Sequence, residues 1–294
     1  MPERSYPYVV VDVFTDVPFA GNPLAVFPDA RGLSDDEMQM LARELNLSES
    51  AFVFPPRDSS SAAKLRLFTP GKEIPFAGHP TIGTSFVLVE RGRAGGASFV
   101  LEENVGPIAV RVERAADPFM AWLSTPPIRF EQTLDAEAAA RTLGLERGDL
   151  LDGAPPQVVS AGNPFFYVAL RERAAVDRAE LDVRAFQRLL PDPDVNGVFI
   201  FAPTEGGVYS RMVAPMSGVR EDPATGSATG PLGAYLAEYG LIEARDGARF
   251  TSEQGVQMKR RSLLHGLLHY RNGTLQTVEV GGSAVHVIDA TVAL

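Results

Sequence analysis

Short runs of apolar residues recur along the chain, many of them alternating with polar residues, which is the pattern of β-strands that bury one face. In the first half the predicted strands are 8–14, 24–27, 51–54, 64–68, 97–101, 108–112 and 120–123. In the second half they are 157–160, 165–170, 197–201, 249–254, 263–270, 274–280 and 284–292. The chain is therefore expected to fold largely into sheets.

The clearest predicted helix begins after Ser34. Ser34 and Glu37 have the spacing of a capping box, in which each side chain bonds the backbone N–H of the other residue. Apolar residues then follow at helical spacing up to Leu45, and the pattern stops at Asn46. Further helices are predicted at 80–90, with Pro80 at the first helical position, and at 136–143, 183–190 and 227–239. The first helix leads almost directly into a strand, so Glu49 lies at a helix-to-strand junction.

One longer pattern occurs twice: a strand, a proline, an acidic residue, a glycine-containing turn and a helix. Its copies are RLFTPGKEIPFAGHPTIGTSFV (66–87) and RMVAPMSGVREDPATGSATGPLG (211–233). The start of a helix presents backbone N–H groups without helical partners, and these groups attract anions. In the second copy Glu221, Asp222, Thr225 and Ser227 lie beside Gly226 at this point. Each copy is therefore a candidate anion site.

Other segments repeat at nearly the same distance. The tetrapeptide Ala-Gly-Asn-Pro begins at residue 20 and again at residue 161, and Arg66 and Arg211 are 145 residues apart (211 − 66). Near-constant offsets favour an internal duplication. The segment 125–127 interrupts the strand pattern, so we predict two domains, 1–126 and 127–294. The last strand is expected to complete the second sheet or to return to the first domain.

Composition narrows the classes of function. The 294 residues are 45% apolar and 22% charged, as in an ordinary globular protein, and the net charge is −10. The basic residues form no stripe that would neutralise a nucleic-acid backbone, so nucleic acid is not an expected partner. The absence of cysteine excludes thiolate nucleophiles and thiolate metal sites. No apolar run at the start has the length of a signal peptide or membrane span, so no membrane partner and a cytoplasmic location are expected.

Four motifs together resemble the PhzF-like family of phenazine-biosynthesis-type isomerases. They are VDVFTDVPFAGNPLAVF, LNLSESAFVF, FTPGKEIPFAGHPTIGT and EDPATGSATGPL, in that order along the chain. The resemblance implies an α/β (α+β) fold like that of diaminopimelate epimerase. In that fold two pseudo-symmetric domains each curl a mostly antiparallel sheet around a central helix, and the active site lies in the cleft between them. It also implies a homodimer that works without a metal or an organic cofactor.

The resemblance gives the repeated helix starts a chemical purpose. The helices that begin after Gly78 and near Gly226 would direct their positive N-terminal ends at the substrate, where they stabilise a carboxylate and the negative charge that builds when a C–H proton leaves. Epimerases of this fold carry a thiol at each of these turns. The corresponding residues here are Ala77 and Thr225, so a two-thiol racemisation is excluded.

The base implied by the resemblance is Glu49, within the Ser-Glu-Ser motif. A carboxylate that faces an apolar cleft can have its pKa raised by burial, which suits it to take a proton from one carbon and return it to another. His79 and Asp222 would orient the substrate or assist proton movement. The implied groups for binding a small carboxylate substrate are Ser48, Gly78, Thr225, Gly226 and Ser227. The implied reaction class is a proton shift in an unsaturated carboxylate like trans-2,3-dihydro-3-hydroxyanthranilate.

Plainer interpretations exist for each of these residues. Taken alone, Glu49 is typical of a solvated helix-end carboxylate, His79 of a histidine bonded to a nearby carbonyl, and Asp222 of a turn or capping residue. His265 and His269 are four apart, as in some zinc sites, but they lie in a predicted strand and lack the glutamate of that motif. Two other functions remain open: a racemase or epimerase that uses carboxylate and histidine, and a binding or interaction protein that keeps the fold without the chemistry.

Overall fold

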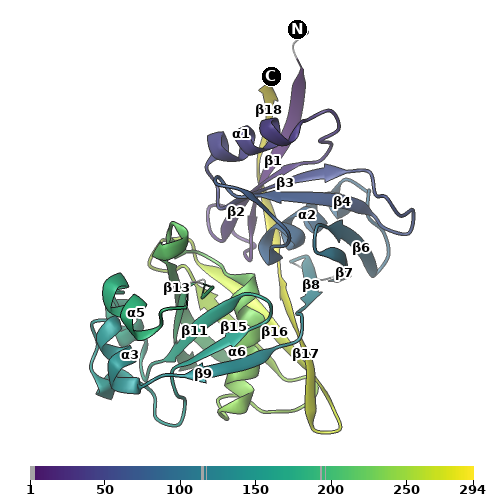
Figure 1. Ribbon diagram of the computed structural model, residues 1–294. Coiled ribbons are helices and arrows are strands. Elements are labelled where there is room, and N and C mark those ends of the chain that lie inside the picture. The colour runs from purple at the N-terminus through teal and green to yellow at the C-terminus, as the bar shows by residue number, and fades with distance from the viewer. Residues whose placement is uncertain (1–3, 114–115, 117, 193, 196) are drawn as a thin grey trace. The chain divides into compact units, whose positions relative to one another are not determined.

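The computed structural model describes residues 4–113, 116, 118–192, 194–195 and 197–294 (Figure 1). The chain forms two compact units. The first comprises Met1–Leu123 together with Gly281–Leu294, and the second comprises Ser124–Val280. Each unit has its own sheet and its own buried helix.

The sheet of the first unit runs in the order β18-β1-β2-β3-β4-β6-β7-β8. The strands are β1 (Ser5–Val13), β2 (Asn22–Phe27), β3 (Glu49–Phe54), β4 (Ala63–Phe68), β6 (Ser98–Glu103), β7 (Gly106–Glu113), β8 (Met120–Ser124) and β18 (Ala284–Ala293). The two-residue strand β5 (Glu73–Ile74) adds to β4. Of these described pairs, β2–β3 and β4–β6 are parallel and the others are antiparallel. The sheet is therefore mostly antiparallel, as expected.

Two helices belong to this unit. Helix α1 (Asp35–Leu45) has the predicted capping box at Ser34 and Glu37 and ends at Asn46 in the left-handed conformation. Helix α2 (Gly78–Glu90) has apolar or small residues on every side, and nine of its thirteen residues are buried. A helix that is apolar all round belongs in a core. It packs against β1, β2 and β3.

The sheet of the second unit runs in the order β9-β10-β11-β12-β13-β15-β16. The strands are β9 (Arg129–Thr133), β10 (Gln157–Ser160), β11 (Pro164–Ala169), β12 (Val198–Thr204), β13 (Gly207–Ala214), β14 (Val219–Asp222), β15 (Arg249–Gln254), β16 (Ser262–Arg271) and β17 (Thr274–Gly282). The short strand β14 adds to β13. Strand β17 leads the chain out of this unit and into the last strand of the first.

The second sheet has a core on each face. Helix α6 (Gly226–Glu238), with eleven of thirteen residues buried, packs with Phe165, Tyr167 and Phe199 on one face. The helices α3 (Ala136–Thr142), α4 (Arg173–Arg178) and α5 (Val183–Leu189) cover Phe166, Val198 and Ile200 on the other. Alternate residues of β11 thus enter different cores, as the alternation of side chains along a strand requires.

The two sheets repeat one succession of strand pairs. The strands β1–β2–β3–β4 form an antiparallel, a parallel and an antiparallel pair, and so do β10–β11–β12–β13. The last strand of each series then has a further parallel partner, β6 beside β4 and β15 beside β13. The register agrees as well: Ala63, three residues before Arg66, pairs with Leu101, and Val208, three residues before Arg211, pairs with Ser252. This likeness supports the internal duplication, which stays a prediction.

Several details differ from the sequence-based expectations. Helix α2 begins at Gly78, so Pro80 is its third residue, where the N–H that proline lacks would have no helical partner anyway. Strands β5, β9 and β14 and helix α4 were not predicted, because each is short and carries many charged residues. Among the described residues, no helix has both the length and the apolar character needed to cross a membrane.

Candidate functional site

Glu49 and His79 lie together in the first unit. Glu49 is the first residue of β3, and its backbone pairs with Leu24 of β2. His79 is the second residue of α2. The histidine Nδ1 lies 3.4 Å from Glu49 Oε2, and the side chains are 5% and 19% exposed, respectively. Two residues that are 30 positions apart (79 − 49) thus meet because α2 packs on the strand that Glu49 begins.

His79 is neutral at ordinary pH. Burial lowers the pKa of its imidazole to about 3, because the charged form would lose its hydration. The other ring nitrogen, Nε2, is buried and has no hydrogen-bond partner among the described residues. A buried polar atom without a partner is costly, so this nitrogen is suited to meet a polar atom of a ligand.

No side chain caps the start of α2. Its N-cap residue is Ala77, which has an extended backbone and no side chain that could bond the first N–H groups. Gly78 then opens the helix, so its first residue has no side chain. Ser48 is half-buried in the connection between α1 and β3, immediately before Glu49. Of the predicted residues in this unit, Glu49 and His79 are therefore in contact, and Ser48 and Gly78 are the residues that precede them in the chain.

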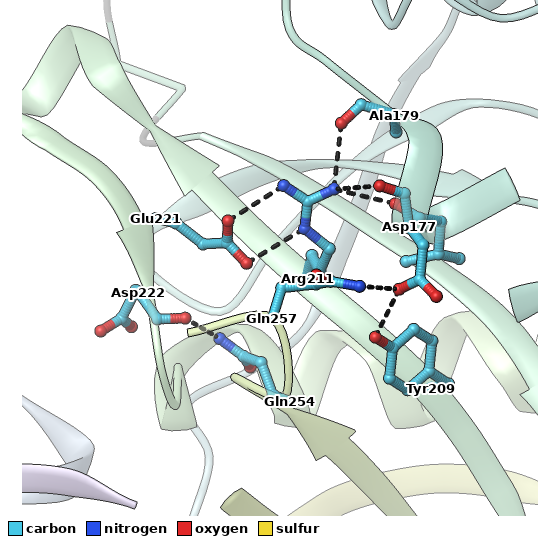
Figure 2. A network of polar contacts seen from close by, with 9 residues as sticks. Asp177, Ala179, Tyr209, Arg211, Glu221, Asp222, Gln254 and Gln257 are labelled. Carbon is cyan, nitrogen blue, oxygen red and sulfur yellow. Dashed lines mark hydrogen bonds and ion pairs between the residues drawn. The ribbon is translucent and has the colours of Figure 1, made fainter. Parts of the chain in front are cut away.

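Asp222 and Thr225 lie together in the second unit (Figure 2 shows Asp222). Asp222 ends β14, and Thr225 is the N-cap of α6. The Thr225 hydroxyl does not cap the helix but donates to Asp222 Oδ2 at 2.5 Å. Gly226 is buried as the first helical residue, and Ser227 beside it is half-buried. The helix thus begins with backbone N–H groups that no cap side chain bonds, as in α2.

Gln254, at the end of β15, fixes this turn from another side. Its Nε2 donates to the Asp222 carbonyl at 2.7 Å and lies 3.0 Å from the Thr225 hydroxyl. Its Oε1 accepts from the Thr225 backbone N–H at 3.2 Å. The amide therefore bonds both Asp222 and Thr225 and holds the turn between them.

A second polar network lies on the other side of β14 (Figure 2). Arg211 of β13 donates from Nε and Nη2 to the two carboxylate oxygens of Glu221, at 3.0 and 2.9 Å. Its Nη1 donates to the carbonyls of Val176 and Ala179 at 2.9 and 3.0 Å. One guanidinium group therefore joins β13, β14 and the end of α4.

The first unit contains a similar pair. Arg66 of β4 donates from Nε and Nη2 to Glu73 of β5, both at 2.7 Å, and Asn104 also donates to Glu73 at 2.8 Å. The hydrogen bonds from Arg66 lower the pKa of the Glu73 carboxyl. Another hydrogen-bonded carboxyl, Glu103 at the end of β6, accepts from Thr81 in the first turn of α2 at 2.5 Å.

Sequence reasoning did not predict roles for Glu73, Glu103 or Gln254. In the structure Glu103 and Gln254 occupy matching places. Each lies two residues after the strand residue that pairs with the position three before Arg66 or Arg211. That correspondence needs the register of the sheets, which no spacing in the sequence supplies.

The pair of histidines in β16 is separate from these groups. His265 and His269 lie in a strand, as expected, where His265 Nδ1 is 3.1 Å from the Thr251 hydroxyl and His269 Nε2 is 3.3 Å from Glu279. Within the described ranges no group of three or more His, Asp or Glu has an arrangement that would hold a metal ion.

Comparisons with known proteins agree over nearly the whole chain. A family model described as phenazine biosynthesis-like protein matches residues 11–290. The trans-2,3-dihydro-3-hydroxyanthranilate isomerase of Pseudomonas fluorescens is 37% identical over 288 residues, which cover 98% of this chain and 99% of that protein. A protein of Mesorhizobium japonicum named an uncharacterized isomerase is 35% identical over 294 residues, covering 96% and 97%.

Solved structures share the fold. A phenazine biosynthesis protein of the PhzF family from Bacillus anthracis superposes with a TM-score of 0.89 at 26% identity, covering 98% of this chain and 99% of that chain. A probable proline racemase from Agrobacterium radiobacter, at 15% identity, has a TM-score of 0.64 over 98% of this chain and 93% of its own and shows the fold alone. The predicted epimerase-like fold class is thus confirmed.

Proposed function

The chain belongs to the phenazine biosynthesis-like protein family, and from that membership we propose that it is an isomerase that shifts a proton between two carbons of a small unsaturated carboxylate. Relatives that carry isomerase names support the class of enzyme. The proposed substrate resembles trans-2,3-dihydro-3-hydroxyanthranilate, the substrate in the name of one of them. The observation that carries the proposal is the contact of Glu49 with a buried, neutral His79 at the start of α2.

Glu49 is the proposed acid and base. As a carboxylate it takes a proton from one carbon, and the electron pair of that C–H bond enters the conjugated system of the substrate. The resulting carboxylic acid returns the proton to a second carbon, so the double bonds move and no proton is consumed overall. A single group suffices when both carbons lie on the same face of the substrate.

His79 is proposed to orient Glu49 and the substrate. With its proton on Nδ1, the neutral imidazole donates toward Glu49 and presents the lone pair of Nε2 to a donor group of the substrate. A protonated imidazole would instead hold the carboxylate in an ion pair and weaken it as a base. The burial that keeps His79 neutral therefore serves the proposed chemistry.

The helix starts are proposed to bind the substrate carboxylate and the charge that develops on it. The N–H groups at Gly78 and Gly226, with the hydroxyls of Ser48, Ser227 and Thr225, are the proposed donors. Asp222, held by Thr225 and Gln254, is proposed to orient a polar group of the substrate. Neither N-cap residue, Ala77 or Thr225, carries an acidic proton, which disfavours a two-base racemase that uses these positions.

We further propose that the protein works as a homodimer in the cytoplasm, without a metal or an organic cofactor, and binds neither nucleic acid nor membrane. Its only proposed partners are the small carboxylate and a second copy of the chain. Sedimentation equilibrium tests the dimer, and the activity assay below, run on protein dialysed against a chelator, tests the independence from metal.

The test is deuterium incorporation from D₂O, followed by NMR, into trans-2,3-dihydro-3-hydroxyanthranilate and related unsaturated carboxylates. Wild type should place deuterium on a ring carbon, and Glu49→Gln should lower the rate at least about a hundredfold, because the amide cannot accept the proton. Glu44→Gln, the same change at an exposed position at the end of α1, should behave as wild type.

Other outcomes are equally informative. Exchange that persists in Glu49→Gln would refute Glu49 as the base and direct attention to His79 and Asp222. Tight binding of a compound without exchange or conversion would identify a binding protein that has kept the fold.

A further inference from the structure

We propose that the Arg211–Glu221 pair is a positioning device that holds β14 in register and thereby aims Asp222 and the start of α6, and that Arg66–Glu73 does the same for the start of α2. The inference extends the proposed function and rests on it for the role of Asp222. It concerns side chains that lie outside the proposed set of substrate-binding residues.

Strand β14 needs such a device. It has only four residues, begins after the left-handed Gly218, and its first two residues, Val219 and Arg220, are exposed. Among the described residues, its pairing with β13 consists of Met212–Asp222 and Ala214–Val219, with an irregularity between. A short strand with few partners has a weakly specified register, and a slip of one residue would turn every side chain to the opposite face.

The Arg211–Glu221 pair fixes the register of β14 through side-chain hydrogen bonds, where the backbone pairing is sparse. Both side chains are largely buried, 13% and 15% exposed. The two parallel hydrogen bonds fix the distance and the orientation of the carboxylate, which a single charge contact would leave free. The third guanidinium nitrogen is bonded to Val176 and Ala179 at the end of α4, so the arginine itself cannot swing with β14.

Fixing Glu221 fixes Asp222. Consecutive side chains of a strand point to opposite faces of the sheet. When Arg211 holds the Glu221 side chain on one face, the Asp222 side chain must therefore lie on the other face, where it accepts from Thr225. The Asp222–Thr225 hydrogen bond and the bond from Gln254 to the Asp222 carbonyl then pass this register to the first residues of α6.

The same device recurs in the other unit with different surroundings. Arg66 and Arg211 occupy matching strand positions, and each makes a two-bond contact with a glutamate on the short strand that leads to a buried helix. The remaining guanidinium nitrogen binds Asp35 at the start of α1 in one case and carbonyls at the end of α4 in the other. The element common to both is the two-bond contact between an arginine and a glutamate of the short strand, which we call the clamp.

The test compares Glu221→Gln and Arg211→Lys with Glu137→Gln, which breaks the exposed Arg141–Glu137 pair on α3 of the same unit. Amide hydrogen exchange of the full chain is measured by mass spectrometry for residues 219–229. We expect exchange at least about tenfold faster in this segment for the two clamp variants, with strands β10 to β12 unchanged, and no change in the control. Arg211→Lys keeps the positive charge but should still show the faster exchange, because a lysine ammonium cannot make the two parallel hydrogen bonds of a guanidinium. Unchanged exchange at 219–229 would overturn the proposal.

The kinetic arm separates positioning from stability. Well below the unfolding temperature, Glu221→Gln should lower kcat/KM of the isomerisation about tenfold or more, since small misplacements in a site are costly. In a chain that already carries Asp222→Asn, Glu221→Gln should lower kcat/KM by less than a further factor of about two, because Glu221 acts through Asp222. Independent, multiplying effects would overturn the route through Asp222. If wild type shows no isomerisation, the proposed function fails, and the exchange measurement still decides whether the clamp holds β14.

Discussion

Glu103 is a buried carboxyl group that the proposed chemistry does not use. It is 5% exposed, it accepts from Thr81, and its second oxygen is buried without a partner among the described residues. Burial raises the pKa of this carboxyl to about 8, against a weaker opposite effect of the Thr81 hydrogen bond. The group therefore keeps its proton at neutral pH. At the corresponding place in the second unit stands Gln254, an uncharged residue of the same length.

Glu103 should make the first unit less stable in alkali. The unfolded chain releases this proton near the ordinary pKa of about 4.5, whereas the folded chain holds it until about pH 8. The folded state then binds more protons across this window, so the free energy of unfolding falls as pH rises from about 4.5 to 8 and is constant above. Glu103→Gln should remove this contribution to the slope and be more stable at pH 8.5 by up to about 5 kcal/mol, at about 1.4 kcal/mol for each pKa unit.

The measurement is urea unfolding at pH 5 and at pH 8.5, followed by the fluorescence of Trp122, the single tryptophan, which is buried in the first unit. Glu44→Gln serves as the control for the loss of a carboxylate. Equal pH dependence in wild type and Glu103→Gln would contradict the prediction.

At the scale of elements, the two buried helices depend on close approach to their sheets. A Cβ at Gly83 of α2 would lie 2.7 Å from methyl groups of both Leu24 and Val13. The helix can therefore reach β1 and β2 only because this residue has no side chain. The same contact keeps His79 against Glu49, since β3 pairs with β2.

Gly83→Val should lower the free energy of unfolding of the first unit by about 3 kcal/mol, because the added methyl groups force the helix away from well-packed strands. Loss of Trp122 fluorescence in urea measures it. Gly95→Val is the matched control, since a Cβ at Gly95 meets nothing within 4 Å. If both variants were equally stable, the close packing of α2 would not limit its position.

The sequence predicted those elements whose pattern is local. The capping box at Ser34, the strands 157–160 and 249–254 and both apolar helices follow from nearby residues, and the structure contains them. Strands β5 and β14 could not be predicted, because two or four partly charged residues have no period. Their conformation is imposed by partners such as Arg66 and Arg211 on the neighbouring strands.

The site was predictable only as far as the family motifs reached. The motifs identified Glu49, His79 and Asp222 as candidates, but the Glu49–His79 contact depends on the pairing of β2 with β3 and on the packing of α2. The partners of Asp222 were equally hidden, since Gln254 is 32 residues away and joins it through the end of another strand. Pairings across sheets decide both, and no residue spacing encodes them.

At the scale of the whole molecule, the first unit is built from the two ends of the sequence. Strand β18 pairs with β1 from Ser5–Ala293 to Val13–Ala284, so the first described residue, Arg4, lies beside Leu294 and exchanges backbone hydrogen bonds with it (Figure 1). The buried residues Val9, Val11 and Val13 of β1 depend on this pairing on one side and on β2 on the other.

Deleting residues 284–294 should cost the first unit about 5 kcal/mol, comparable with the stability of a typical domain. Trp122 should then emit like an exposed tryptophan without denaturant, while circular dichroism retains the signal of the second unit. A chain lacking only Leu294 is the control. A native Trp122 spectrum in the deletion variant would show that β18 is dispensable.

The return of β18 also orders events on the ribosome. The second unit is contiguous in sequence, so translation delivers all of its strands before the last partner of β1 exists. Until then the edge of the valine-rich strand β1 that later pairs with β18 has no partner. Unpaired strand edges of this kind promote the aggregation of incompletely folded chains, which chaperones counteract. We therefore expect the first unit, which carries Glu49 and His79 and most of which is translated first, to complete its folding last.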